Sequence, residues 1–253
     1  MKKTISLAAW GLGAALALTT ACSSNKTAQN SPVESSGAGK GTAPASATAK
    51  QSDVALVRFI NGTTSSKDLG FGDATPFAGI GERDVTAYKS LPAQRHEFKL
   101  FAKNDTANAL ATDSEGLTSG KHYTVLAYTN KSGKTSLDNI ADDLTPPAAG
   151  QAKVRVINMA PGMEKVDLYA GGKNPLISGA GLDHATDYKE VNPSEAELTV
   201  RHGMSKRNSA PVSDLTLEAG KLYTILVFQD KNGKVKVKTI KDEFTTAPNG
   251  TNS

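Results

Sequence analysis

The 253-residue chain is poor in the residues from which metal sites and disulfides are made, with one cysteine, Cys22, and four histidines. A single cysteine has no disulfide partner within the chain, and it cannot supply the paired thiolates of most structural zinc sites. No histidine stands at metal-site spacing from another: His96, His122, His184 and His202. We therefore expect ordinary surface histidines, no metal and no cofactor.

Catalytic motifs are also missing from the sequence. There is no serine-nucleophile elbow, and the pair Gly70 and Gly72 lacks the following helix that a phosphate-binding loop needs. The acidic pairs Asp142-Asp143 and Asp242-Glu243 could each supply half of a calcium site, but no acidic cluster accompanies them, so we interpret them as the polar exit of a last strand. We predict no catalytic residues and no enzymatic activity, and the alternative is a hydrolase with an unfamiliar site.

The first 21 residues have the three parts of a signal peptide. Two lysines precede an uncharged run from Ile5 to Leu18. Its length of about 14 residues covers about 21 Å of a membrane core about 30 Å thick, which is short for a permanent anchor. Ala21 directly before Cys22 resembles the lipobox of bacterial lipoproteins, although Thr19 stands where leucine is commonest.

The lipobox resemblance implies that Cys22 is the lipid-attachment site, with acyl chains such as palmitate holding the mature protein on a membrane that it does not span. Ser23 resembles the residue that permits transfer to the outer membrane of two-membraned bacteria. We therefore expect a cell-envelope protein on the outer rather than the inner membrane. The alternative is an ordinary secreted protein with a free thiol at Cys22.

A low-complexity segment follows, with Val33 as the one large aliphatic residue between positions 22 and 52. Such a stretch buries too little apolar surface to offset its ordering entropy. We expect residues 22–52 to be the lipidated cysteine and a disordered tether of about 30 Å from end to end. Residues 246–253 are predicted to be a polar tail.

Four blocks of sequence occur twice, and they show that a domain is duplicated. The pairs are Val57–Asn61 with Val154–Asn158, Thr86–Lys89 with Thr186–Lys189, Ser119–Leu126 with Ala219–Leu226, and Ile140–Leu144 with Ile240–Phe244. From Val57 to Val154 the offset is 97 residues, and from Thr86 to Thr186 it is 100. A period this long indicates whole domains. We place the first repeat at 53–145, a linker at 146–151 and the second repeat at 152–245.

Within each repeat, short runs rich in Val, Ile, Leu, Tyr and Thr are separated by Gly, Pro and Asn, which is typical of β-strands. Asn232-Gly233, and Ser132-Gly133 in the first repeat, predict type I′ hairpins. The Leu-x-x-Gly-x-x-Tyr spacing that ends at Tyr123 and at Tyr223 resembles the tyrosine corner of immunoglobulin-like domains. The predicted fold is all-β, with two tandem immunoglobulin-like antiparallel β-sandwiches.

The second repeat resembles the bacterial domain-of-unknown-function family 4397. The resemblance rests on Val154–Pro161, on Val166–Gly172 and on Ala219–Thr224, and the first repeat departs from the first motif with Gly62-Thr63-Thr64. It implies β-sandwich modules of secreted and lipid-anchored proteins, often in tandem, for which no catalytic residues are agreed. The resemblance therefore indicates the fold more closely than the function.

The charge balance argues against a nucleic acid partner. Of 29 basic residues, two leave with the signal peptide, and the remaining 27 against 25 acidic residues give about +2. Locally, Lys234, Lys236 and Lys238 alternate with valines, which predicts a strand with lysines on one face. We interpret this strand as a solvated edge protected by lysine; the alternative is a stripe that binds an anionic polymer.

The leading hypothesis is a lipid-anchored cell-envelope protein with a structural or protein-binding role and no catalysis. Its partners would be the membrane, through Cys22, and an envelope protein. The main alternative is a binding module for an anionic envelope glycan.

Overall fold

The computed structural model describes residues 53–194, 197–203, 208–230 and 232–243. These residues belong to one compact unit. The predicted signal peptide, Cys22, the tether and the 246–253 tail lie outside the described residues.

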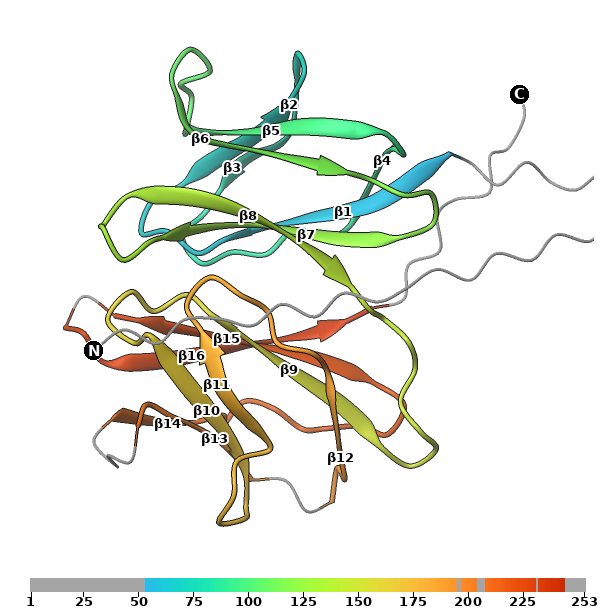
Figure 1. The fold of residues 1–253 in the computed structure, drawn as a ribbon, viewed down its shortest axis with the longest axis vertical. Coiled ribbons are helices and arrows are strands. Elements are labelled where there is room, and N and C mark those ends of the chain that lie inside the picture. The colour runs from blue at the N-terminus through green and yellow to red at the C-terminus, as the bar shows by residue number, and fades with distance from the viewer. Residues whose placement is uncertain (1–52, 195–196, 204–207, 231, 244–253) are drawn as a thin grey trace, which may run out of the picture. The chain divides into compact units, whose positions relative to one another are not determined.

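The first repeat is a sandwich of two four-stranded sheets (Figure 1). One sheet has the order β4-β1-β7-β8 and the other β3-β2-β5-β6. The strands are β1 Val54–Asn61, β2 Lys67–Phe71, β3 Ala74–Ile80, β4 Lys89–Pro92, β5 Arg95–Ala102, β6 Ala109–Gly116, β7 His122–Thr129 and β8 Thr135–Asp142.

The second repeat has the same topology, with sheets β12-β9-β15-β16 and β11-β10-β13-β14. Its strands are β9 Ala152–Asn158, β10 Lys165–Ala170, β11 Ile177–Gly181, β12 Lys189–Val191, β13 Leu198–Arg201, β14 Ser209–Pro211, β15 Leu222–Gln229 and β16 Val235–Asp242. In both repeats the first strand runs parallel to the seventh, and the other pairs are antiparallel. The prediction of two all-β sandwiches is confirmed.

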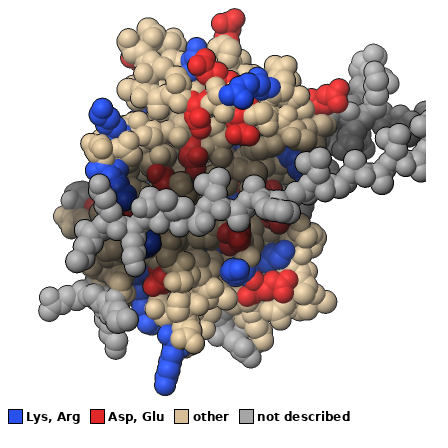
Figure 2. Space-filling model, in the orientation of Figure 1, with Lys and Arg blue, Asp and Glu red and all other residues tan. Residues whose placement is uncertain are grey.

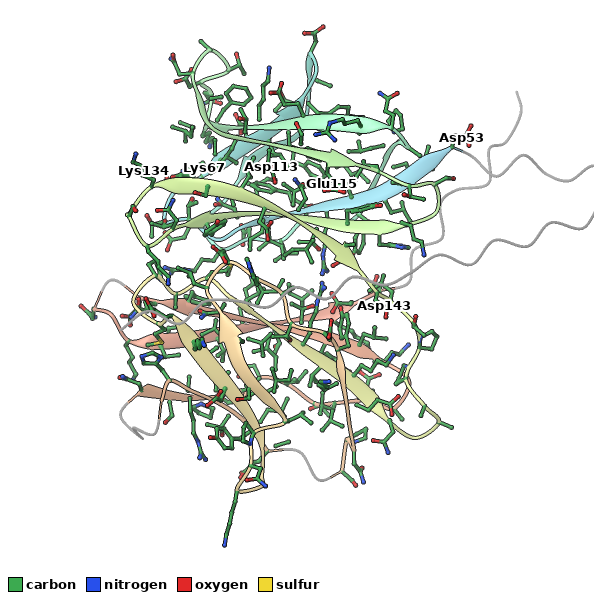
Figure 3. All side chains as sticks on the ribbon, in the orientation of Figure 1. Asp53, Lys67, Asp113, Glu115, Lys134 and Asp143 are labelled. Atoms are coloured by element: carbon green, nitrogen blue, oxygen red, sulfur yellow. The ribbon has the colours of Figure 1, made fainter. Side chains whose placement is uncertain are left out.

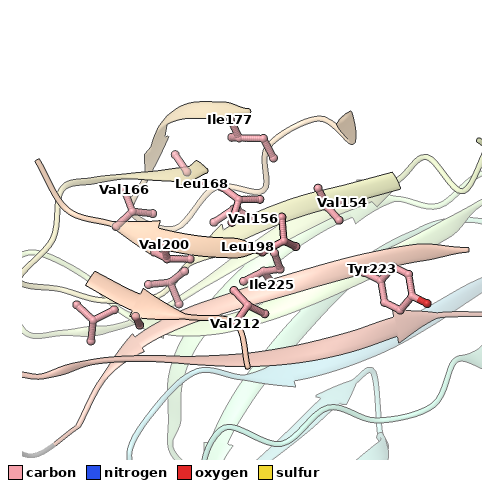
Figure 4. Close-up of a cluster of buried hydrophobic side chains, with 14 of the residues drawn as sticks. Val154, Val156, Val166, Leu168, Ile177, Leu198, Val200, Val212, Tyr223 and Ile225 are labelled. Carbon is pink, nitrogen blue, oxygen red and sulfur yellow. The ribbon is translucent and has the colours of Figure 1, made fainter. Parts of the chain in front are cut away.

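Each sandwich has its own apolar core between its two sheets. In the second repeat this core is built mainly from aliphatic side chains, among them Val154, Val156, Leu168, Val200 and Ile225 (Figure 4). The first repeat fills the same space with more aromatic side chains, including Phe59, Phe77 and Phe98. The two cores therefore differ in composition while the topology around them stays the same.

Four central strands, β1, β7, β9 and β15, are buried on both faces. In β1 the residues Val57 and Phe59 enter the core of the sandwich, whereas Ile60 on the opposite face joins a separate apolar cluster. Strands of this kind lack the alternation of a half-exposed sheet. For this reason the polar residues in them, such as the buried Arg58 and Thr124, must find partners within the protein.

Both tyrosine corners are present. The backbone N–H of Thr118 donates to Tyr123 Oη at 3.1 Å, and that of Glu218 donates to Tyr223 Oη at 3.1 Å. The intervening glycines, Gly120 and Gly220, have φ of 74° and 80°, a conformation that favours glycine. The predicted corner geometry is confirmed in both repeats.

The predicted type I′ hairpins are wrong. In the first repeat, Gly133 N donates to Asn130 O and Asn130 N donates to Lys134 O, both at 2.9 Å. Only the glycine has a positive φ, of 73°, whereas a type I′ turn needs two such residues. The loop is therefore a type I turn followed by a left-handed glycine. The second repeat has the same bonds, because Asp230 and Gly233 take the places of Asn130 and Gly133.

Removing a corner hydroxyl should destabilise the fold. Tyr223→Phe leaves the N–H of Glu218 without its acceptor, and we expect a loss of about 1 kcal/mol in the free energy of unfolding, measured by urea denaturation. Tyr169→Phe, at a half-buried tyrosine of the same repeat, is the control and should change the midpoint far less. Equal losses in the two variants would contradict a structural role for the corner.

Candidate functional site between the two repeats

An apolar cluster joins the two repeats. Side chains from the outward faces of β1 and β7 meet their counterparts from β9 and β15, and the buried members are Ile60, Leu126, Tyr128, Ile157, Met159 and Leu226. Figure 1 shows the sheets that carry these strands facing each other. The same face carries the most strongly buried charges that the structure describes.

Two buried ion pairs cross between the repeats. Arg58 Nη1 of the first repeat lies 2.7 Å from Asp242 Oδ1 of the second, and Arg155 Nη2 of the second lies 2.6 Å from Asp142 Oδ1 of the first. All four side chains are at most 3% exposed. Each arginine thus takes its counterion from the other repeat.

Within its own repeat, each arginine is held by a threonine and a tyrosine. Arg58 Nε donates to Thr124 Oγ1 at 2.8 Å, and its guanidinium carbon lies 4.9 Å from the centre of the Tyr88 ring. Arg155 makes the same contacts with Thr224, at 2.9 Å, and with Tyr188, at 4.7 Å. The guanidinium is therefore oriented before it reaches the partner carboxylate.

The carboxylates are held in the same way by their own repeats. Asp142 Oδ2 accepts hydrogen bonds from Tyr88 Oη at 2.8 Å and Thr124 Oγ1 at 2.7 Å. Asp242 Oδ2 accepts from Tyr188 and Thr224 at the same two distances. These hydrogen bonds replace part of the hydration that each carboxylate loses on burial.

The network relates equivalent positions of the two repeats by a pseudo-two-fold axis. Arginine, tyrosine, threonine and aspartate occur at matching positions, and one arginine–aspartate ion pair crosses in each direction. This is the pattern of an isologous dimer interface, here formed within one chain. We call these eight residues the exchange network: Arg58, Tyr88, Thr124, Asp142, Arg155, Tyr188, Thr224 and Asp242.

The pseudo-symmetry is broken where the equivalent residues Gly62 and Met159 meet. A Cβ on Gly62 would lie 2.6 Å from Met159 Sδ and 2.7 Å from the backbone oxygen of Ala127. A large residue in one repeat therefore requires a glycine in the other. At this contact the first repeat is therefore complementary to the second. Neither repeat is complementary to a second copy of itself.

A second asymmetric pair lies in the equivalent loops at positions 83 and 183. Arg83, with φ of 59°, donates from Nη2 to Gln229 O at 2.6 Å and stacks on Phe228. Asp183, with φ of 73°, forms a hydrogen bond with Tyr128, and burial together with that aspartate raises the pKa of Tyr128 to about 12. Both loops therefore reach the opposite repeat.

Burial and charge act in opposite directions on Asp142. Burial alone would raise the pKa of the Asp142 carboxyl, but Arg155 and Arg58 outweigh it and hold this pKa below its ordinary value of 3.8. Burial and the adjacent carboxylate of Asp142 raise the pKa of Tyr88, so the hydroxyl stays protonated and donates. The network is therefore ionised at Asp142 and neutral at the tyrosine near pH 7.

The interpretation of both acidic pairs as polar strand exits is wrong for their first members. Asp142 and Asp242 are buried and bind arginine, because the last strand of each sandwich ends against the other repeat. Asp143, labelled in Figure 3, is exposed and hydrogen-bonds Thr145. Within the described ranges no group of three or more histidine and acidic side chains is placed to hold a metal ion.

The prediction of surface histidines is wrong for His96, which is buried. The ring of His96 lies beside the ring of Phe71, and its Nε2 lies 2.7 Å from Pro92 O. His184 is exposed as predicted, whereas His202 and His122, which lies against the ring of Tyr88, are half-buried. The described histidines are spread over separate elements.

The lysine strand is an edge strand, as interpreted. β16 pairs only with β15, and Val235 and Val237 pack on the core of the second repeat. Lys236 is exposed, whereas Lys238 Nζ donates to Arg83 O at 2.9 Å and lies 3.3 Å from Asp84 Oδ1. On the face drawn in Figure 2, basic and acidic side chains are interspersed over the described surface.

Sequence reasoning did not find the exchange network, although a signal was present. An arginine inside an otherwise apolar strand occurs in both repeats, in Val57-Arg58-Phe59 and Val154-Arg155-Val156. A charge repeated inside a buried strand requires a buried counterion. The repeated aspartates were the available acids.

Comparison with known families identifies both sandwiches. The model described as domain of unknown function, DUF4397, matches residues 45–169 and 152–253. The chain belongs to the DUF4397 family. The first repeat of this DUF4397 protein matches the family model in its own right, despite its departures at Gly62-Thr63-Thr64.

Two solved structures resemble the DUF4397 protein at a low level. One is a "putative cell adhesion protein" from Bacteroides uniformis, with 11% identity and a TM-score of 0.24 over 76% of this chain and 98% of the other. The second is a streptococcal virulence factor that binds α-glucan, with 14% identity and a TM-score of 0.21 over 71% and 95%. Likeness at this level bears on neither fold nor function. No curated protein matches the sequence.

A double-mutant cycle tests the crossing ion pair. Arg58→Met and Asp242→Leu each leave one buried charge unpaired, and each should cost about 3–5 kcal/mol in the free energy of unfolding. Because the double variant removes both charges, it should be more stable than either single variant. The exposed inter-repeat pair Lys131–Glu164, at 3.0 Å, is the control and should show much weaker coupling. Additive losses at Arg58 and Asp242 would contradict the assigned pair.

Lowering the pH should reduce the free energy of unfolding, because Asp142 becomes protonated. Since its pKa is lowered on folding, its contribution to stability is present above pH 3.8 and is lost as the pH falls through the lower folded-state value. Urea unfolding of the native protein and of Asp142→Asn from about pH 6 to about pH 2 should show a stability difference that shrinks below about pH 4. A difference that stays constant over this range would mean that Asp142 is not ionised in the folded state.

Proposed function

We propose that this DUF4397 protein is a lipid-anchored cell-envelope protein that acts without catalysis, in a structural or protein-binding role. The observation that carries the proposal is the exchange network. Its eight polar side chains recur in both domains, and the arginine–aspartate pairs among them join the two repeats. Residues used in this way hold two domains together, which is a structural task.

The charges of the exchange network neutralise one another, and this supports a non-catalytic role. A catalytic acid or base must reach a substrate within hydrogen-bonding distance. Asp142 and Asp242 instead direct both oxygens at arginine, tyrosine and threonine of this chain. Among the described residues no helix is long and apolar enough to cross a membrane.

The proposed cellular location of the protein rests on the sequence of its N-terminus. The charged start, the apolar run and Ala21-Cys22 support acylation of the single cysteine, and Ser23 supports the outer membrane. Two or more acyl chains give stable attachment where one does not. The tether would then place the two sandwiches at a distance from the lipid, where an envelope protein or glycan partner is within reach.

Intact mass and membrane fractionation test this proposal in a two-membraned bacterium. We expect the wild type to carry a diacyl or triacyl mass on Cys22 and to fractionate with the outer membrane. Cys22→Ser should lose the lipid mass and leave the membrane or remain unprocessed. As the matched control, Ser23→Asp should keep the lipid mass and shift to the inner membrane. An unacylated wild type cleaved near Ala21 would overturn the lipoprotein assignment.

A further inference from the structure

The two sandwiches differ at one lateral edge, which is closed in the first repeat. There β6, with eight residues, runs beside β8, and Asn139 Nδ2 donates to Asp113 Oδ2 at 2.7 Å. Figure 3 labels Asp113 and Glu115 on β6. Ala111 of β6 and Leu137 of β8 both pack against the core of the first repeat. The first repeat therefore leaves little space between its two sheets at this edge.

The same edge of the second repeat contains a groove. β14, the counterpart of β6, has three residues, and between it and β16 lies a groove of about 640 Å³. Its lining is mostly polar and consists of Ser209, Ala210, Pro211, Val212, Ser213, Asp214, Lys234, Val235, Lys236, Val237, Lys238 and Thr239. Hydroxyl and carboxylate groups thus lie opposite a row of lysines.

The two repeats also differ in charge at this lateral edge. The first repeat has Ser136 and Asp138 where the second has Lys236 and Lys238. With Lys234 the second repeat carries three lysines at alternate positions, about 7 Å apart along an extended strand. Lys234 and Lys236 are exposed, and the Lys238 side chain is 43% exposed while it contacts Asp84. The repeat that has the groove is also the repeat that has the positive charge.

We infer that the groove between β14 and β16 binds a linear anionic glycan, a polymer that offers regularly spaced negative groups and free hydroxyls. The lysines provide charge complementarity at a repeating interval. Ser213, Asp214 and Thr239 can exchange hydrogen bonds with sugar or polyol hydroxyls, which an acidic polypeptide backbone does not offer. This inference rests on the proposed envelope location, because that is where such polymers occur.

Binding is measured by titration calorimetry with the full processed chain at low and high salt. The probes are a glycerol-phosphate teichoic acid and the delipidated polysaccharide of a lipopolysaccharide, with neutral dextran and poly-glutamate as comparisons. We expect at least one anionic glycan to bind, more weakly at high salt, and more tightly than either comparison polymer. The glycan that binds more tightly identifies the source of the polymer.

Variants locate the site. Lys234→Ser combined with Lys236→Ser should weaken binding about tenfold. Ser213→Trp, which fills the groove without changing charge, should weaken it similarly. Lys134→Ser in the first repeat is the matched control and should leave affinity unchanged. Unchanged binding in both groove variants, or an equal loss in the control, would overturn the inference, as would tighter binding of poly-glutamate.

The two proposals fail separately. An acylated, membrane-bound protein that binds neither glycan would leave the lipoprotein proposal intact and remove the groove assignment. A protein that binds the glycan through the groove but carries no lipid would do the reverse.

Discussion

The exchange of counterions between the repeats is the constraint on which the rest of the structure depends. Arg58 and Arg155 are buried in strands of opposite repeats, and each is neutralised by an aspartate from the other. A buried guanidinium without its partner is strongly destabilising. The pairing therefore requires β1, β7, β9 and β15 to be covered on both faces, and this explains their nearly unbroken apolar sequences. The two tandem repeats therefore share one interface, which consists of the ion pairs and the apolar cluster.

Much of the fold could be predicted from the sequence because its signals are local. Strand composition, the glycine of each tyrosine corner and the two-fold repetition of Val57–Asn61 depend only on residues near one another in the chain. The hairpin type could not be assigned from Ser132-Gly133, because the loop is one residue longer than the dipeptide suggests. Where the two repeats meet depends on contacts between residues far apart in sequence.

The candidate site was less predictable for the same reason. Arg58 and Asp242 are separated by almost the whole folded chain. The repeated arginine and the repeated aspartate do not by themselves indicate which acid neutralises which base. The lysines of β16 were visible in the sequence, but the groove beside them depends on the shortness of β14. Both repeats keep the residues of the exchange network, whereas the lateral edge that forms the groove differs between them.

Differential scanning calorimetry of the processed chain tests most directly whether the exchange network joins the two repeats into one cooperative unit. The account predicts a single transition whose calorimetric enthalpy equals its van't Hoff enthalpy and corresponds in size to both repeats together. Two resolved transitions, or a calorimetric enthalpy about twice the van't Hoff value, would show that the repeats unfold independently and would contradict it.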